Sequence, residues 1–234
     1  MYTHIYETRY GDFKDFETLK YSSLLDTIQD VAIKDSEMKG YGIYALRDMH
    51  MAWLLLGIRV KFDMPLSTRY PLEVSTAVKK MKGATSERGC IIKQNGKTVA
   101  RSIANWFLFD SEKERICKIP LEMSQSYEPY DFEDEFFTYI KPETHEADEV
   151  AYTITVGNKE IDTNKHLNNQ KSAELLMDAL PYDFEMDEMR VLYKTPAYLG
   201  DTLEVCRIKT DKGYYVHLQT TDKNICVAGE FVSK

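Results

Sequence analysis

The chain contains the stretch Arg59-Val60-Lys61-Phe62-Asp63-Met64-Pro65 and, at an offset of 131 positions (59 to 190), the stretch Arg190-Val191-Leu192-Tyr193-Lys194-Thr195-Pro196. The same offset places Leu72-Glu73-Val74 on Leu203-Glu204-Val205 without a gap. Strands share composition, so two of them can match by chance. However, several matches at one constant offset are typical of a repeated unit. Near the end of the chain, Val227-Ala228 also matches Val99-Ala100 at a slightly smaller offset. We therefore predict two copies of one architecture.

The first copy is expected to contain one long helix and several long strands. Apolar residues recur every three or four positions from Leu24 to Ala32, which predicts an amphipathic helix from about Thr18. Asn95-Gly96 is a strong signal for a hairpin turn. Strands are predicted at 6–10, 53–56, 59–64, 72–78, 88–94 and 98–109. This arrangement is α+β, a curled antiparallel sheet around a central helix, which is the pattern of the hotdog fold.

The two predicted copies are joined by a segment of different composition. Residues 111–148 contain three prolines and the acidic run 131–135. Such a segment is expected to be a linker over the surface, and its many aromatic residues indicate that it packs down against the protein. The predicted organisation is a tandem hotdog, with an N-terminal unit at 1–125, a linker at 126–144 and a C-terminal unit at 145–234.

Near the start of the second unit, polar residues stand at alternate positions, Asp162, Asn164 and His166. If the segment is extended, alternate side chains point to one face and these three converge. A helix is predicted directly after it, at 172–180 before Pro181. One interpretation is an Asx-type turn and helix cap, in which these polar side chains satisfy free backbone N–H groups. The other is a hydrolytic site, because an imidazole can change charge near neutral pH.

The stretch from Asp162 to Lys171 reads Asp-x-Asn-x-His, then hydrophobic-Asn-Asn-x-Lys, and it resembles the signature of acyl-ACP thioesterases. Residues 24–32 resemble the first central helix of that family, and 105–120 resemble the end of its first unit. The resemblance implies a tandem hotdog in which the C-terminal unit carries the catalytic residues. It also implies hydrolysis of fatty acyl-acyl carrier protein (ACP) to a free fatty acid and ACP.

By this resemblance, Asp162, Asn164 and His166 form one catalytic network. His166 would accept a proton or polarise water or the carbonyl, and Asn164 would orient water or donate to the thioester oxygen. Asp162 would be base, nucleophile or orienter. Family members often carry a glutamate in the strand after the catalytic helix, and Pro196 falls at that position here. This departure leaves three alternatives. Asp162 is sufficient as the only catalytic carboxylate, another acid such as Glu174 replaces the glutamate, or turnover is impaired.

The resemblance further implies a long apolar slot for the acyl chain in the first unit. The candidate wall residues are Leu24, Ile28, Trp53, Leu55 and Trp106, although the sequence favours an ordinary core role for each of them. A basic stretch from Lys79 to Arg101 could dock the acidic ACP or a phosphopantetheine phosphate, or it could be a solvated hairpin face. The alternatives are an acyl-CoA thioesterase of the same fold, a non-hydrolytic acyl-thioester binding protein and, least favoured, a hotdog dehydratase. A homodimer is possible.

The composition of the chain argues against several other classes of protein. The 234 residues carry a formal net charge of −8, which argues against a general nucleic-acid binder. The cysteines lack metal-ligand spacing, so we expect isolated buried thiols, no metal and no cofactor. The longest apolar run, 51–56, is too short to span a membrane, and the start lacks a basic region followed by an apolar run. A cytoplasmic protein is therefore expected.

Overall fold

The predicted repeat corresponds to two structural units in the computed structural model, which describes residues 1–147 and 149–234. Unit 1 is Met1–Tyr139 and unit 2 is Ile140–Lys234. The elements of unit 1 are β1 (Tyr2–Tyr6), the 3-10 turn η1 (Tyr10–Asp12), α1 (Tyr21–Met38), α2 (Ile43–Asp48), β2 (Met51–Phe62), β3 (Leu72–Lys82), β4 (Thr85–Gln94), β5 (Lys97–Asp110), β6 (Arg115–Ile116) and α3 (Leu121–Gln125). The elements of unit 2 are β7 (Glu149–Thr155), α4 (Asn169–Asp178), β8 (Met186–Tyr193), β9 (Thr202–Lys209), β10 (Gly213–Thr220) and β11 (Ile225–Ser233).

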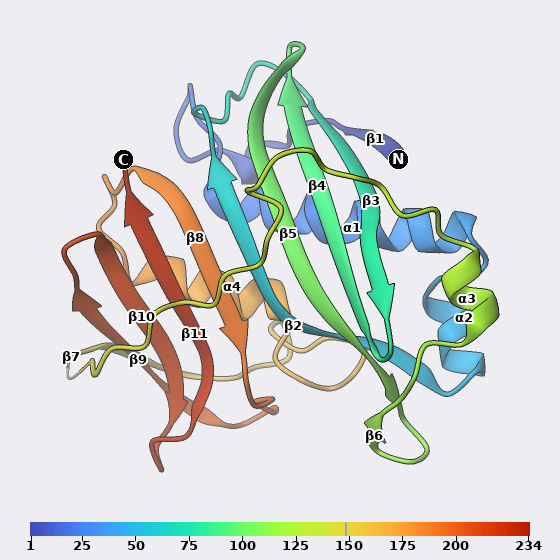
Figure 1. The fold of residues 1–234 in the computed structure, drawn as a ribbon. Coiled ribbons are helices and arrows are strands. Elements are labelled where there is room, and N and C mark those ends of the chain that lie inside the picture. The colour runs from blue at the N-terminus through green and yellow to red at the C-terminus, as the bar shows by residue number, and fades with distance from the viewer. Residues whose placement is uncertain (148) are drawn as a thin grey trace. The chain divides into compact units, whose positions relative to one another are not determined.

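The two units have the same strand order (Figure 1). Unit 1 is ordered β1-β3-β4-β5-β2 and unit 2 is ordered β7-β9-β10-β11-β8, with antiparallel neighbours. The repeated stretches occupy equivalent strands, β2 with β8 and β3 with β9. In each unit one main helix, α1 or α4, packs against the sheet. The structure thus confirms the α+β tandem hotdog predicted from the sequence.

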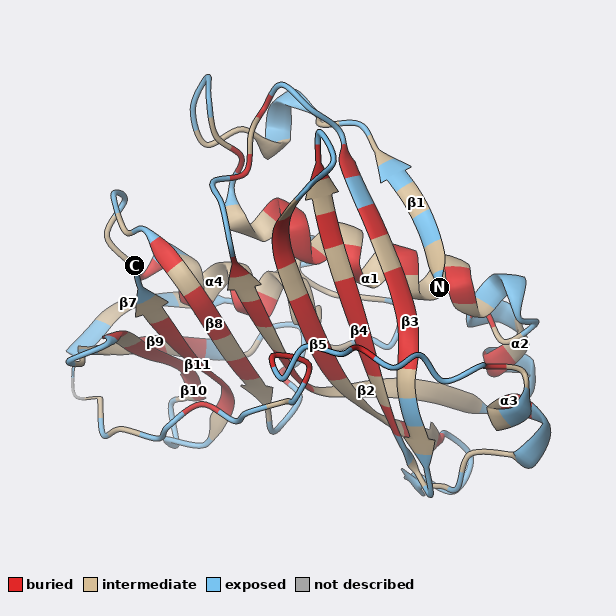
Figure 2. Cartoon of the chain, turned by 45° about the horizontal axis from the view of Figure 1, so that its top comes forward, coloured by how far each residue is buried: buried red, intermediate tan, exposed pale blue. Residues whose placement is uncertain are grey.

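Helix α1 buries one face against the sheet of unit 1. Its apolar residues Leu24, Leu25, Ile28 and Val31 are buried, as the three- and four-residue spacing predicts. Buried positions run along β3, β4 and β5 in front of this helix (Figure 2). The hairpin between β4 and β5 turns at Asn95-Gly96, whose φ angles of 48° and 73° lie in the left-handed region that Asn and Gly tolerate.

Three strand predictions in unit 1 were wrong in their bounds. The predicted strands 53–56 and 59–64 are one strand, β2, whose register shifts between Leu55 and Gly57. A bulge interrupts the alternation without ending the pairing, so the sequence pattern appeared broken. The strand expected at 6–10 is instead β1 at Tyr2–Tyr6. The chain turns after it because the Asp12 carboxylate accepts hydrogen bonds from the Arg9 backbone and guanidinium.

Aromatic residues of the predicted linker belong to the core of unit 1. Phe132, Phe136 and Phe137 are buried against Ala77 and Ile103, on the face of the sheet away from α1. The unit boundary accordingly falls after Tyr139, inside the segment 126–144 that was expected to be a linker. Aromatic rings bury large apolar areas, which favours this packing over a solvated path.

Gly89 permits that packing, and replacing it should be costly. A Cβ on Gly89 would lie 2.6 Å from the Phe132 ring, which is buried and stacked on Phe137 at 4.1 Å between centroids. We expect Gly89→Ala to lower the free energy of unfolding by roughly 1–3 kcal/mol through overpacking. Urea unfolding would measure the loss.

Gly11→Ala serves as the matched control, because a Cβ at Gly11 meets nothing within 4 Å. Adding Phe132→Leu to Gly89→Ala should recover part of the loss by removing the ring edge. Equal stability of Gly89→Ala and wild type would contradict the contact.

In unit 2, helix α4 lies close to β11. Ala173 and Leu176 are buried, and a Cβ on Gly229 would lie 3.0 Å from Leu176 Cδ1. On the opposite face of the sheet, the Glu143 amide donates to the Glu230 carboxylate at 3.3 Å. The His145 ring packs edge-on to Tyr215.

No helix among the described residues is long and apolar enough to cross a membrane.

Candidate functional site

The segment that carries the predicted site residues is a tight turn. Ile161 and Leu167 form an antiparallel bridge, and the Asp162 amide donates to the His166 carbonyl at 2.9 Å. The Lys165 amide donates back to the Asp162 carbonyl at 3.0 Å, with Lys165 in the left-handed region at φ 64°. The expectation of an extended segment with alternating side chains was therefore wrong. The turn forms because the Asp162 side chain can accept hydrogen bonds from backbone amides just after it in the chain. An extended segment would not bring those amides to the carboxylate.

Asp162 organises this turn through its carboxylate. Oδ1 accepts the backbone N–H of Asn164 at 2.8 Å and lies 3.4 Å from the His166 amide nitrogen. The interpretation as an Asx-type turn thus describes the local conformation. The helix cap is a different residue, Asn168, whose side chain accepts from the amides of Gln170 and Lys171 at the start of α4.

The turn brings the three predicted residues together through the backbone. Asn164 is exposed, whereas Asp162 and His166 are half-buried. Among the described contacts, no side-chain hydrogen bond joins the Asp162 carboxylate, the Asn164 amide and the His166 imidazole to one another. The structure therefore supplies an imidazole beside a turn held by a carboxylate, rather than a closed chain of side-chain hydrogen bonds.

The loop between β8 and β9 of unit 2 lies against His166. The Leu167 amide donates to the Ala197 carbonyl at 2.8 Å, and His166 forms an isolated bridge with Tyr198. The Tyr198 ring meets the imidazole edge-on, with centroids 5.0 Å apart. Tyr198 was missed by sequence reasoning. The sequence feature that could have indicated Tyr198 is its position two residues after Pro196, where the resemblance places the family glutamate.

Glu174, the acid named as a replacement for that glutamate, and Glu160, an acid that the sequence analysis did not consider, both have other partners. Glu174 pairs with Lys171 on α4 at 2.6 Å, which fits a helix-surface role. Glu160, just before the turn, accepts the Gly157 amide at 2.9 Å through its side chain and the Asn168 amide through its carbonyl. Among the described contacts, Asp162 is the carboxylate held against the backbone of the His166 turn.

The three buried cysteines do not offer a nucleophile. Cys206 and Cys226 of unit 2 are buried, and burial raises the pKa of both thiols. A thiol must lose its proton to attack a carbonyl, so these side chains are poor nucleophiles near neutral pH. Cys90 of unit 1 is also buried, and its thiol pKa is raised in the same way. The described residues contain no cluster of His, Cys, Asp and Glu that could hold a metal ion.

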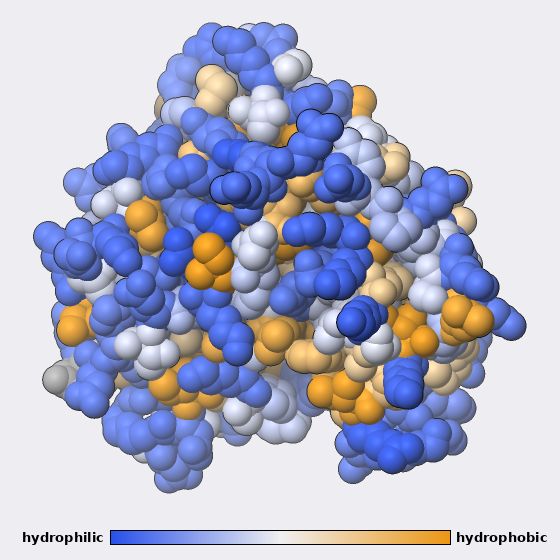
Figure 3. Space-filling view, in the orientation of Figure 1, coloured by the Kyte–Doolittle hydropathy of each residue, from blue (hydrophilic) through white to orange (hydrophobic). Residues whose placement is uncertain are grey.

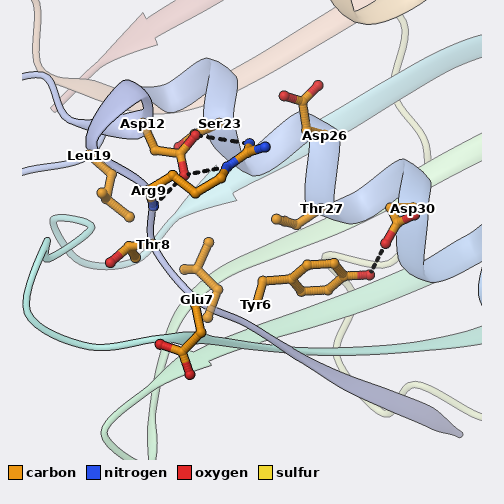
Figure 4. Close-up of a pocket in the computed structure, with 11 residues that line it drawn as sticks. Tyr6, Glu7, Thr8, Arg9, Asp12, Leu19, Ser23, Asp26, Thr27 and Asp30 are labelled. Atoms are coloured by element: carbon orange, nitrogen blue, oxygen red, sulfur yellow. Dashed lines mark hydrogen bonds and ion pairs between the residues drawn. The ribbon is translucent and has the colours of Figure 1, made fainter.

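The expected wall of the acyl slot lies in unit 1. Leu24 and Ile28 of α1 are buried, and Trp53, Leu55 and Trp106 of β2 and β5 are half-buried. A separate cavity of ≈ 270 Å³ lies between β1, η1 and α1 (Figure 4). Among its polar groups, Arg9 pairs with Asp12, and the Tyr6 hydroxyl donates to Asp30 at 2.8 Å.

The basic stretch is less available for a partner than the sequence indicated. Arg88 is buried and pairs with Asp35, and Arg101 pairs with Asp63 and Asp134. The Lys79 ammonium donates to the Phe137 carbonyl at 2.5 Å. Lys80 and Lys82 at one end of β3, and Lys97 at the start of β5, remain exposed.

Comparisons with known proteins agree with the fold. Two hotdog units in one chain, with a histidine turn before the helix of the second, define a tandem-hotdog protein. Family models match residues 1–127 as an acyl-ACP thioesterase N-terminal domain and 143–230 as an acyl-ACP thioesterase C-terminal domain. The chain belongs to the acyl-ACP thioesterase family, and thus to the thioester hydrolases. No curated protein gives a significant match to the sequence.

Solved structures of similar proteins show the same fold. An acyl-ACP thioesterase from Bacteroides thetaiotaomicron has a TM-score of 0.80 at 16% identity, covering 100% of this chain and 96% of its own. The 12:0-ACP thioesterase from Umbellularia californica has a TM-score of 0.86 at 11% identity, with 100% and 96% coverage. A thioesterase-superfamily structure from Jannaschia sp. CCS1 covers 54% of this chain and 90% of its own at 13% identity, with a TM-score of 0.51.

Proposed function

We propose that this protein hydrolyses fatty acyl-ACP thioesters, releasing a free fatty acid and ACP. The observation that carries the proposal is the His166 turn inside a chain whose two halves both match acyl-ACP thioesterase domains. A thioester carbonyl is electrophilic, so an activated water and a donor to the developing oxyanion are sufficient for hydrolysis.

In the proposed reaction, the His166 imidazole removes a proton from water as the water oxygen attacks the thioester carbonyl carbon. The Asn164 side-chain amide donates to the oxygen on which negative charge develops. When the C–S bond breaks, the electron pair leaves with sulfur. The imidazolium returns the proton to that sulfur, which yields the ACP thiol, and the acid then ionises.

Asp162 is assigned to holding the turn, because its carboxylate oxygen faces the two backbone amides described above. Asp162→Asn keeps an acceptor oxygen and removes the charge, whereas Asp162→Ala removes the acceptor. We expect Asp162→Asn to retain at least about half of kcat. Asp162→Ala should lose about 1 kcal/mol of stability and most of the activity, since the turn loses a hydrogen-bond acceptor.

Steady-state assays and urea unfolding of the two variants measure this difference. If Asp162→Asn is as inactive as a variant without the imidazole, while unfolding like wild type, the carboxylate charge takes part in the chemistry. Asp162 would then be a base or nucleophile rather than an orienter of the turn.

The partner that delivers the acyl group is proposed to be ACP. The face in Figure 3 is mostly hydrophilic, with hydrophobic residues in separate patches. The net charge of −8 disfavours an acidic partner, so docking is assigned to local cations such as exposed Lys80 and Lys82. A weaker dependence of acyl-CoA hydrolysis on these cations would follow, because CoA presents no acidic protein surface.

The test is a panel of acyl-ACP and acyl-CoA substrates of matched chain length, with His166→Ala as the control enzyme. The proposal predicts free fatty acid from acyl-ACP at a kcat/KM well above that for acyl-CoA. A strong preference for CoA would make the protein an acyl-CoA thioesterase. Tight binding of acyl-ACP with only background hydrolysis, equal in wild type and His166→Ala, would make it a binding protein.

A further inference from the structure

The loop between β8 and β9 holds the backbone of Tyr198 in place. The Tyr198 amide donates to the Asp201 carboxylate at 2.8 Å, and the Asp201 amide donates to the Tyr198 carbonyl at 3.1 Å. Gly200, at φ 90°, closes this turn, and its amide donates to the Val156 carbonyl at 2.9 Å. The loop is therefore fixed both within itself and to the chain that leaves β7.

The Tyr198 ring lies against the His166 imidazole. The planes of the Tyr198 and His166 rings meet at 82°, an edge-to-face arrangement that aromatic pairs prefer. The Asp162 turn fixes the backbone of His166, but backbone hydrogen bonds leave the side-chain torsions free to rotate. Among the described contacts of the His166 ring, the contact with Tyr198 is the one that restricts those torsions.

We propose that Tyr198 is a positioning residue that holds the His166 imidazole in the orientation needed for hydrolysis, an inference that rests on the proposed function. The contact uses the ring rather than the phenol hydroxyl. In this chain the loop has no glutamate at Pro196, and the side chain it places against the imidazole is aromatic. The Tyr198 side chain is half-exposed, 50%, so its removal leaves no large cavity in the core.

The kinetic test compares Tyr198→Phe with Tyr198→Ala. Phenylalanine keeps the ring, so its kcat should stay within about twofold of wild type. Alanine frees the imidazole, so its kcat should fall roughly tenfold with little change in KM, because misorientation of a catalytic group slows the chemical step. Leu199→Ala, the exposed neighbour in the same loop, is the matched control and should resemble wild type.

A second measurement follows the ring itself without substrate. The edge-to-face contact should shift the His166 ring-proton resonances, which His166→Ala assigns by their disappearance among the five histidines. At one fixed pH, the shift should persist in Tyr198→Phe and be lost in Tyr198→Ala. Circular dichroism of both variants would confirm that the fold is intact.

The outcomes separate the two claims. If His166→Ala keeps wild-type hydrolysis, the proposed mechanism fails, while the resonance shifts still report whether Tyr198 holds the ring. If His166→Ala is inactive but Tyr198→Ala matches wild type in kcat and in ring resonances, the inference about Tyr198 is overturned. Loss of activity in Tyr198→Phe equal to that in Tyr198→Ala would also overturn it, since the ring would then be insufficient.

Discussion

His166→Ala is expected to reduce kcat for acyl-ACP hydrolysis by about 10²–10⁴-fold, the range that general acid–base groups contribute. The variant cannot remove the proton from the attacking water or return it to the leaving sulfur. Stability should change little, because the described hydrogen bonds of His166 use its backbone amide and carbonyl. Steady-state kinetics and a thermal melt of the same preparation measure both quantities.

A matched control removes a histidine elsewhere. His50 is exposed in unit 1 and has φ 56°, a conformation that asparagine tolerates, so His50→Asn should leave both activity and melting temperature unchanged. Were His166→Ala to melt far below wild type while keeping full activity per folded molecule, the turn would be structural only.

The second large effect concerns stability. Arg88 on β4 and Asp35 in the last turn of α1 form a buried ion pair at 2.6 Å, with side chains 7% and 9% exposed. Arg88→Ala leaves the Asp35 carboxylate buried without its cation, which should cost about 3–5 kcal/mol of unfolding free energy. Urea unfolding, followed by circular dichroism, measures this loss.

Two further variants make that result interpretable. The double variant Arg88→Met with Asp35→Leu removes both charges and should be close to wild type or more stable, because no unpaired charge remains. Arg69→Ala breaks the exposed pair with Glu17, whose side chains are 67% exposed, and should have no measurable effect. If Arg88→Ala were as mild as Arg69→Ala, the buried pair would not contribute as described.

Local and repeated patterns predicted most of the fold. Asn95-Gly96 predicted its hairpin because left-handed backbone geometry is a property of those two residues. The repeat predicted equivalent strands because each unit needs the same buried positions. Local patterns could not predict that two of the expected strands form the single strand β2. A bulge near Leu55 changes the alternation while the pairing with β5 continues, and that pairing is non-local.

The candidate site was located from the sequence, but its geometry was not. The motif identified Asp162, Asn164 and His166 by type and spacing. The conformation of the turn decides whether the Asp162 carboxylate accepts a hydrogen bond from the backbone or from the imidazole. The alternating pattern of polar residues predicted an extended segment, and that conformation was wrong. The Tyr198 contact and the Asp35–Arg88 pair join residues far apart in sequence, so no local pattern could indicate them.

The central claim is that water, activated by His166, attacks the thioester carbonyl directly. A rapid-quench single turnover of acyl-ACP in H₂¹⁸O tests it by mass spectrometry of the fatty acid and of the peptide that carries Asp162. The account predicts one ¹⁸O in the fatty acid carboxylate from the first turnover and an unlabelled Asp162. Unlabelled fatty acid in that turnover, with ¹⁸O in the Asp162 carboxylate, would contradict it.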